Sequence, residues 1–437
     1  MTCDNGFNQP IQNKLPSGAR SIRQNLVFSE NEIRRKPISI THLTFGKKFN
    51  QSIKNCIRCE APCVCQNSVF CNCKNRICQK PSSITHLTFG LYFNQPINGC
   101  IPESVTHLKF GYCFNQPIKG CIPPSITHLK FNGVFNQSID GCIPSSVTYL
   151  KFGEQFNQSV YNCIPSSIIY LKFGDFFNQP IKNCIRREAL SVCQNPPSVT
   201  HLKFGWKFNQ SIKDSILSSV THLTLKGYFH QSIKDRIKSV THLTLYLDSF
   251  RSVKNCIPLS VTHLKLGNCS IQFIKDNVLP SVTHLTLGGV FNKSIKNTIP
   301  QSITHLTFGW RFNQSVKECI PLSVTHLTFG HDFNQPIENS IPSSVIYLSF
   351  DEDFNQPIKG HIPSSVKYLE FGKHFNQSIK NCIPLSVTYL EFGECFNQSI
   401  KGNISSLVKY LKFYKKFEKF KMKHVPLNVE KLKFIHH

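Results

Sequence analysis

The sequence predicts a repeat solenoid built on one parallel β-sheet of about 18–19 short strands, joined by turns and irregular return segments. The first observation is a unit that returns every 21 residues along almost the whole 437-residue chain, for example at Ser104–Pro123. Fixed periods of this length are typical of solenoids, in which each coil packs on its neighbours. The second observation is a single strand-like run in each unit, such as Val105–Phe110, where Leu108 and Phe110 are two residues apart.

The number of strands follows from one leucine in each unit. These leucines stand at positions 43, 87, 108, 129, 150, 171, 202, 223, 243, 264, 285, 306, 327, 348, 369, 390, 411 and 432. Ser21–Phe28 is expected to be one more, slightly irregular copy. We rank a parallel β-helix second, because each coil shows only one clear strand.

The rest of the unit supplies turns, core residues and a hydrogen-bond ladder. Gly111 follows the strand and is expected in a turn with positive φ. Phe114 and Ile118 add core side chains, and Pro123 closes the coil where no ladder donor is needed. Asn115 recurs in most coils, so we predict that each such side chain satisfies backbone groups of the next coil.

The predicted organisation has three parts. Residues 1–20 are a partial N-terminal repeat, and residues 21–403 form the solenoid, with a cysteine-rich insertion at about 58–80 and a short one at about 186–195. Residues 404–437 are expected to be a capping repeat, which solenoids need for solubility. A membrane-surface amphipathic element is the alternative for this last part.

Composition indicates an intracellular protein with acidic partners. The net charge of +26 favours acidic or anionic partners, although most of it comes from a few repeat positions copied many times. We see no signal peptide and no apolar stretch long enough to span a bilayer. The 20 cysteines then fit a reducing compartment. We therefore expect a cytoplasmic monomer, in the host cytoplasm if the protein is viral.

Two landmarks of the unit resemble a known family. The strand pattern Val/Ile-x-x-Leu-x-Phe is similar to the strand half of a leucine-rich repeat. Together, Phe93–Ile97 and Cys100–Pro102 resemble FNIP repeats, also called IP22 repeats, of social amoebae and of the giant viruses that infect amoebae. The resemblance implies a leucine-rich-repeat-like fold, protein–protein interaction and no catalytic residues. Some members carry an F-box before the repeats, but Phe7–Ile11 already looks like a repeat, so we expect none here.

In a leucine-rich repeat, the side chains between the core positions of the strand face the concave surface. Here they are His or Tyr at the third position of the run and a residue that varies along the chain at the fifth. The candidate partner-binding residues are Lys109, Lys130, Lys151, Lys172, Lys203, His107, His128, Tyr149, Tyr170, His201, Glu370 and Glu391. Two interpretations stay open: a docking groove graded from basic to acidic, or drift on a solvated face.

The recurring histidines raise the question of a metal site or a pH switch. We favour a stacked column that fills one slot of the sheet, because Tyr replaces His in six coils. We find no His–carboxylate grouping on adjacent coils that argues for a metal site.

The cysteine-rich insertion is a hypothetical zinc site. Its candidate ligands are Cys56, Cys59, Cys63, Cys65, Cys71, Cys73 and Cys78. A similar segment, Ile185–Asn195, has Arg187 and Ser191 at two of the cysteine positions, so the inserted segment exists without the full cluster. Zinc is the only cofactor that the sequence raises.

The overall prediction is a non-enzymatic protein-interaction scaffold with an elongated concave surface. One alternative is a substrate-recognition or adaptor role with host ubiquitin machinery. Another is anion or nucleic-acid binding through the basic columns, which we disfavour for nucleic acid because the abundant phenylalanines lie at core positions. The Asn ladder is interrupted near His230, Arg251 and Ile271, and we predict that this middle region is the least stable and a possible hinge.

Overall fold

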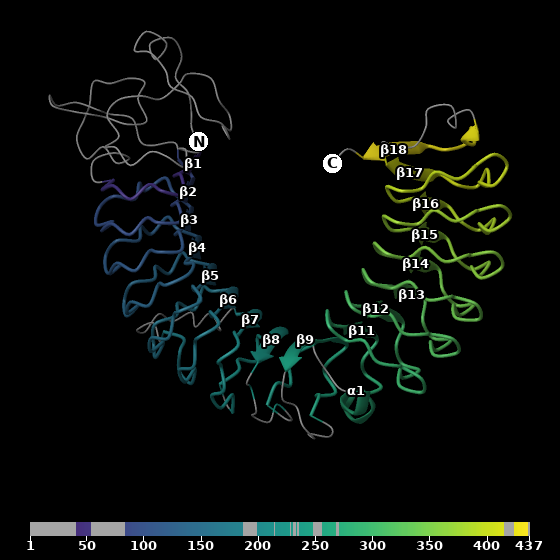
Figure 1. The fold of residues 1–437 in the computed structure, drawn as a ribbon. Coiled ribbons are helices and arrows are strands. Elements are labelled where there is room, and N and C mark those ends of the chain that lie inside the picture. Colours follow the sequence, from purple (N-terminus) through teal and green to yellow (C-terminus); the bar gives the residue numbers. More distant parts are fainter. Residues whose placement is uncertain are drawn as a thin grey trace, which may run out of the picture. The chain divides into compact units, whose positions relative to one another are not determined.

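The computed structural model describes residues 41–53, 84–186, 199–213, 215–227, 229, 233, 236–247, 256–267, 271–414 and 424–435. The chain divides into two compact units, Met1–Gln231 and Ser232–His437. Within each unit the strands line the inner side of a curved stack of coils (Figure 1).

The described residues of the first unit contain eight parallel strands. They are β1 (His42–Thr44), β2 (His86–Thr88), β3 (His107–Lys109), β4 (His128–Lys130), β5 (Tyr149–Lys151), β6 (Tyr170–Lys172), β7 (His201–Lys203) and β8 (His222–Gly227). Each strand pairs with the next one along the chain, and equivalent residues face each other, as Leu108 faces Leu129.

In the part of the second unit that the structure describes, there are ten parallel strands and one helix. They are β9 (His242–Leu247), β10 (His263–Leu266), α1 (Ile271–Asn277), β11 (His284–Leu287), β12 (His305–Phe308), β13 (His326–Thr328), β14 (Tyr347–Ser349), β15 (Tyr368–Glu370), β16 (Tyr389–Glu391), β17 (Tyr410–Tyr414) and β18 (Lys431–Ile435). The same register continues through this unit, from His242 facing His263 to Leu411 facing Leu432.

The predicted parallel solenoid is confirmed. Every leucine of the predicted series from Leu43 to Leu432 lies in a strand, and the described residues contain 18 strands. Outside these strands, the described residues form one isolated bridge, Ile164 to Ile185, so the coils do not build the further sheets of a β-helix. The expected extra copy at Ser21–Phe28, residues 1–20, the cysteine-rich insertion and most of the second insertion lie outside the described residues.

Two columns of phenylalanine rings form the core. Phe110 and Phe114 stack within one coil with their ring centroids 4.0 Å apart, and both are fully buried. Phe110 also stacks on Phe131 at 5.2 Å, and Phe114 on Phe135 at 6.1 Å, in the next coil. The core is therefore continuous along the stack, and each coil leaves an apolar face that only another coil covers.

The structure corrects the reason for the glycine after the strand. Gly111 does not have a positive φ; a Cβ on it would lie 1.7 Å from the carbonyl oxygen of Gly90 in the preceding coil. The glycine is needed because neighbouring turns approach closely. Positive φ occurs mainly in the second turn, at glycine or asparagine in most coils, as at Gly120 (φ 68°) and Asn162 (φ 53°), and at Glu318 (φ 56°) in one.

The predicted asparagine ladder is confirmed. The Asn115 N–H donates to Asn94 Oδ1 at 2.9 Å, and the Gln116 side chain donates to the same oxygen at 3.1 Å. This bond recurs from Asn50 to Asn209 in the first unit and from Asn292 to Asn397 in the second.

The coils between these two runs are built differently. Ile271 begins α1, and Asn277 at its end accepts from the Cys256 N–H at 2.8 Å and donates to the Phe273 carbonyl at 3.1 Å. The boundary between the two units, at residue 231, falls in this stretch. His230 and Arg251 lie outside the described residues, and the predicted low stability of this region stays a prediction.

We predict that Asn136→Ala lowers the free energy of unfolding by about 1–3 kcal/mol, because Asn136 Oδ1 accepts from both Asn157 N–H and Gln158 Nε2. Urea denaturation and hydrogen exchange at Asn157 measure the loss. Asn136→Asp retains the acceptor oxygen and should lose less. Equal loss in the two variants would contradict a role for this oxygen.

We predict that Gly111→Ala destabilises the chain by roughly 1–3 kcal/mol, because the new methyl group would collide with the neighbouring turn. Gly289→Ala is the matched control, since a Cβ there meets no atom within 4 Å. It should stay within about 0.5 kcal/mol of wild type. Similar urea midpoints for the two variants would refute the close-approach explanation.

Candidate functional site

The strands place two side chains of each coil on the face opposite the core. In β3, Leu108 is buried between His107 and Lys109, which alternate to the other face. The same arrangement repeats from coil to coil because the register is constant. The predicted candidate residues therefore lie in columns that run across the strands of each unit.

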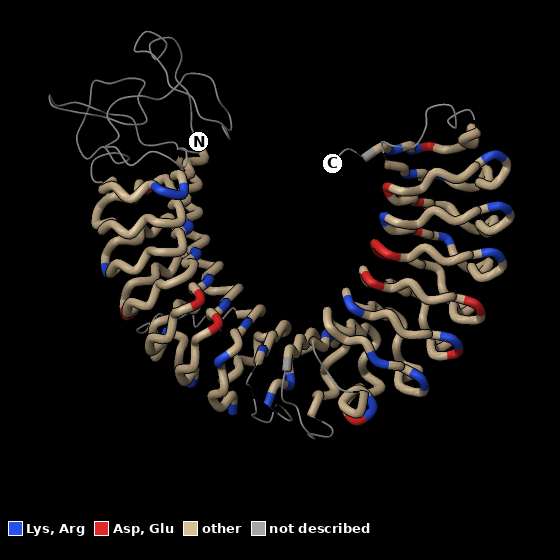
Figure 2. Tube along the Cα trace, viewed as in Figure 1, with Lys and Arg blue, Asp and Glu red and all other residues tan. Residues whose placement is uncertain are grey.

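The five candidate lysines of the first unit form one such column, here called the lysine column (Lys109, Lys130, Lys151, Lys172 and Lys203). Their positive charges follow the inner side of the stack (Figure 2). Burial lowers the pKa of Lys172, and the neighbouring Lys151 lowers it further. The column is bounded, because threonines occupy the same position in β2 and β8.

Two candidate tyrosines lie against this column. Lys130 Nζ is 4.9 Å from the ring centroid of Tyr149, and Lys203 Nζ is 5.2 Å from that of Tyr170. Cation–π contacts of this kind hold the ammonium groups over the strand face. Asp175, in the turn that follows β6, offsets part of the positive charge near Lys172.

The turns beside the lysine column carry exposed aromatic side chains that the sequence interpretation missed. Tyr112, Phe176 and Trp206 are 41%, 47% and 37% exposed, and Tyr92 is 52% exposed. The expectation that the abundant phenylalanines lie at core positions holds for the repeated ones but is wrong for Phe176. The sequence does distinguish these residues. They stand one or two positions after the glycine that follows the strand (the glycine slot), and outside the periodic phenylalanine positions.

The two candidate glutamates differ in what they offer a partner. Glu391 is 5% exposed; it forms an ion pair with Lys412 and accepts from the Tyr389 hydroxyl at 2.9 Å. Glu370 accepts from Ser349 at 3.2 Å, and burial together with Glu391 raises the pKa of its carboxyl group. The acidic end of the face is therefore largely engaged within the protein.

The histidine and tyrosine column is a stack of rings. His107 stacks on His86 and on His128 with ring centroids 4.1 Å apart, and Tyr368 stacks on Tyr389 at 4.0 Å. In each histidine of the column, Nδ1 lies close to the hydroxyl of the threonine that precedes it in the sequence. For His107 the distance is 2.9 Å. Burial lowers the pKa of His107, and the adjacent imidazole of His128 lowers it further. His201, the remaining candidate, stacks on His222 at 4.0 Å.

The proposed zinc ligands, Cys56 to Cys78, all lie outside the described residues. A different grouping appears in the turns of the second unit. His331, Asp332 and Asp353 offer ligand atoms that all lie within 4.8 Å of one another. The statement that no His–carboxylate grouping occurs on adjacent coils is therefore wrong. The 21-residue offset of Asp332 and Asp353 is visible in the sequence, but both residues lie in turns, outside the strand positions that carry the histidine column.

The fold and the columns define a class: a leucine-rich-repeat-like solenoid with one strand per coil. The FNIP Repeat family model matches eight segments, at residues 79–113, 114–155, 156–185, 190–228, 251–289, 291–318, 316–353 and 354–395. The chain belongs to the FNIP repeat family, and the predicted resemblance is confirmed.

One solved structure similar to this chain is that of the giant-virus protein CroV588, described as a novel circular LRR protein. The two chains are 30% identical, the match covers 91% of this chain and 79% of CroV588, and the TM-score is 0.36. No curated protein matches the sequence. In the described part of the chain, every helix is too short or too polar to cross a membrane.

The stacked histidines predict a pH-dependent stability. The pKa of His263 lies at about 4 and that of His284 also lies below the usual 6.5, because of burial and the neighbouring imidazoles, so at these residues the unfolded chain binds more protons than the folded one between pH 4 and 6.5. The free energy of unfolding should therefore fall as the pH drops from 6.5 towards 4. Urea midpoints between pH 7.5 and pH 4.5 measure this slope.

The double variant His263→Tyr, His284→Tyr is the control for that slope. Tyrosine already occupies this column in other coils and carries no proton-linked charge in this range. The variant should lose stability less steeply on acidification than wild type. An unchanged slope would show that the two histidines do not contribute to it.

Proposed function

We propose that the chain is a non-enzymatic protein-interaction scaffold, and that the lysine column binds an acidic segment of a protein partner. The observation that supports this most strongly is the register of the five lysines, which brings like charges together on one face of a sheet. The proposal includes a monomeric protein that acts in the cytoplasm, the host cytoplasm if it is viral.

The electrostatics of the column favour an acidic partner. Neighbouring parallel strands are about 4.8 Å apart, so the five lysines extend over about 20 Å. Like charges at such spacing repel each other, and the pKa of Lys172 is lowered first by burial and then by the neighbouring Lys151. Carboxylates of a bound segment would remove this repulsion, and they would steer the partner towards the column during association.

The exposed aromatic side chains support a protein partner in particular. Tyr112, Phe176 and Trp206 lie in turns of the same coils as Lys109, Lys172 and Lys203. Aromatic residues are enriched among the side chains that dominate protein–protein binding energy. A basic column beside exposed aromatic rings also suits single-stranded nucleic acid, so nucleic acid is the alternative that the test must separate.

The non-catalytic part of the proposal rests on the repeat class and on the state of the reactive side chains. His107 and His128 of the column are stacked, and burial lowers the pKa of both. Most described cysteines at the recurring position are buried, Cys319 being half-buried, and burial raises the pKa of the Cys184 thiol to about 12. These groups are therefore poor candidates for nucleophiles or bases near neutral pH.

We predict that reversing the charge of Lys109, Lys130 and Lys151 to Glu weakens binding of a labelled polyglutamate peptide about tenfold or more, which corresponds to about 1.4 kcal/mol. Fluorescence anisotropy at low and at physiological salt measures the affinity. The wild-type affinity should fall with salt, because the contact is mainly electrostatic.

The matched control reverses Lys119, Lys182 and Lys213, three exposed turn lysines that change the net charge by the same amount. This variant should bind the peptide nearly as well as wild type. Equal losses in the two variants would reduce the effect to net charge and overturn the proposal. Tighter, column-dependent binding of single-stranded RNA than of peptide would instead favour the nucleic-acid alternative. Column-dependent binding of a ubiquitin-ligase subunit would favour the adaptor alternative.

A further inference from the structure

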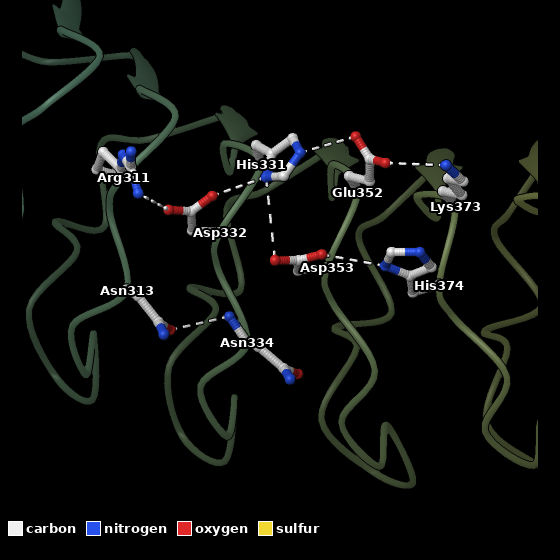
Figure 3. A network of polar contacts seen from close by, with 9 residues as sticks. All are labelled: Arg311, Asn313, His331, Asp332, Asn334, Glu352, Asp353, Lys373 and His374. Atoms are coloured by element: carbon white, nitrogen blue, oxygen red, sulfur yellow. Dashed lines mark hydrogen bonds and ion pairs between the residues drawn. The ribbon is translucent and has the colours of Figure 1, made fainter.

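We infer that three consecutive turns of the second unit form a binding site for a divalent transition-metal ion such as Zn²⁺, with His331, Asp332 and Asp353 as its protein ligands. The turns follow β13, β14 and β15 (Figure 3). This site lies outside the strand face and does not depend on the proposed partner binding.

The site occupies positions that the repeat leaves variable. In each coil two residues separate the glycine slot from the next core phenylalanine, and here they are His331-Asp332, Glu352-Asp353 and Lys373-His374. The equivalent pairs include Leu91-Tyr92 and Tyr112-Cys113. Copying of the repeat unit therefore does not account for two imidazoles and three carboxylates in three adjacent turns.

The ligand atoms converge on one point. His331 Nδ1 lies 2.7 Å from Asp332 Oδ1 and 3.9 Å from Asp353 Oδ2, as Figure 3 shows. Zinc bonds of about 2.0–2.1 Å in tetrahedral geometry place ligand atoms about 3.3 Å apart. The two observed separations lie on either side of that value, so small rotations of half-exposed side chains are enough to admit the ion.

The surrounding bonds orient the ligands as in known metal sites. His331 Nε2 donates to Glu352 Oε2 at 2.8 Å, which leaves Nδ1 facing the two aspartates. Metal-binding histidines typically donate their other ring N–H to a carboxylate in this way. Asp353 uses its second oxygen, Oδ1, to contact His374 Nδ1 at 3.0 Å, so its Oδ2 stays directed towards His331.

Two basic side chains beside the site pair with carboxylate oxygens that do not face the proposed ion. Arg311 pairs with Asp332 Oδ2 at 3.7 Å, and Lys373 pairs with Glu352 Oε1 at 3.1 Å. These exposed ion pairs are weak and leave the inner oxygens to the ion. A set of one imidazole nitrogen and two carboxylate oxygens suits zinc, cobalt, nickel or copper better than calcium or magnesium, which prefer oxygen ligands alone.

A proton and a metal ion compete for the same place. His331 Nδ1 lies 2.7 Å from Asp332 Oδ1, so an imidazole that carries a proton on Nδ1 donates it to this carboxylate. A metal must displace that proton from Nδ1, and binding should weaken as the pH falls. The alternative is a purely structural ion-pair network, which would be indifferent to metal.

The test is a titration of the full chain with ZnCl₂ at pH 7.5 and pH 5.5, followed by calorimetry and by hydrogen exchange at residues 331–353. Wild type should bind one equivalent more than His331→Gln or Asp353→Asn at pH 7.5, and this equivalent should be lost at pH 5.5. Counting by difference is needed because the cysteine-rich insertion is a separate candidate for zinc. His361→Gln, a histidine in the same unit outside the cluster, should retain the wild-type stoichiometry.

Cobalt provides a second measurement. Co²⁺ at this site should give visible bands without the near-ultraviolet thiolate absorption, because its ligands are nitrogen and oxygen. The variant Asp353→Asn should lose those bands while its far-ultraviolet circular dichroism stays that of wild type. Identical zinc stoichiometry in wild type and both variants would overturn the inference. Binding of calcium that survives His331→Gln, without a zinc difference, would overturn it as well.

Discussion

The register between consecutive coils is the constraint on which the rest of the structure depends. Backbone bonds join each strand to both of its neighbours, as when the His107 N–H donates to Thr85 and the Phe110 N–H donates to Lys130. Because the usual offset is one full unit, each residue faces its own equivalent in the next coil. A residue type at a repeated position must therefore pack against a copy of itself, and only some residue types do so without repulsion.

Phenylalanine and asparagine meet this condition, whereas charged residues do not. Phenylalanine rings stack in series, and the asparagine side chain accepts from the backbone of the next asparagine, so both extend without limit. Histidine packs against its own copy without repulsion only when its imidazole is neutral. Lysine and glutamate repel their copies, so a row of either must bind a counter-charge or end, and Glu391 shows this by pairing with Lys412 in the following strand. Where the internal counter-charge is only partial, as in the lysine column, where Asp175 acts on Lys172, the structure itself gives a reason for an external one.

Much of the fold follows from periodicity alone, because a constant register places every equivalent residue in the same position of each coil. The strands from Leu43 to Leu432 and the ladder through Asn115 were predictable for this reason. The role of Gly111 was not, since it depends on how closely two neighbouring turns approach in space. The helix α1 was missed because it replaces an irregular coil whose sequence has lost the repeat pattern. The register, which places Lys412 opposite Glu391, could be predicted from the sequence. Their ion pair could not, because it also depends on the orientation of the two side chains.

The histidines show where specific chemistry arises in such a molecule. In the column, His263 lies between like imidazoles, and burial with these neighbours lowers its pKa. In the variable turn, His331 lies among carboxylates from its own coil and the next, and its pKa is raised. The same side chain thus repels a cation in the repeated position and attracts one in the variable position. Since a column forces like next to like, a site of mixed ligands can form only where the repeat is broken, and the turns after the strands are where this chain breaks it most freely.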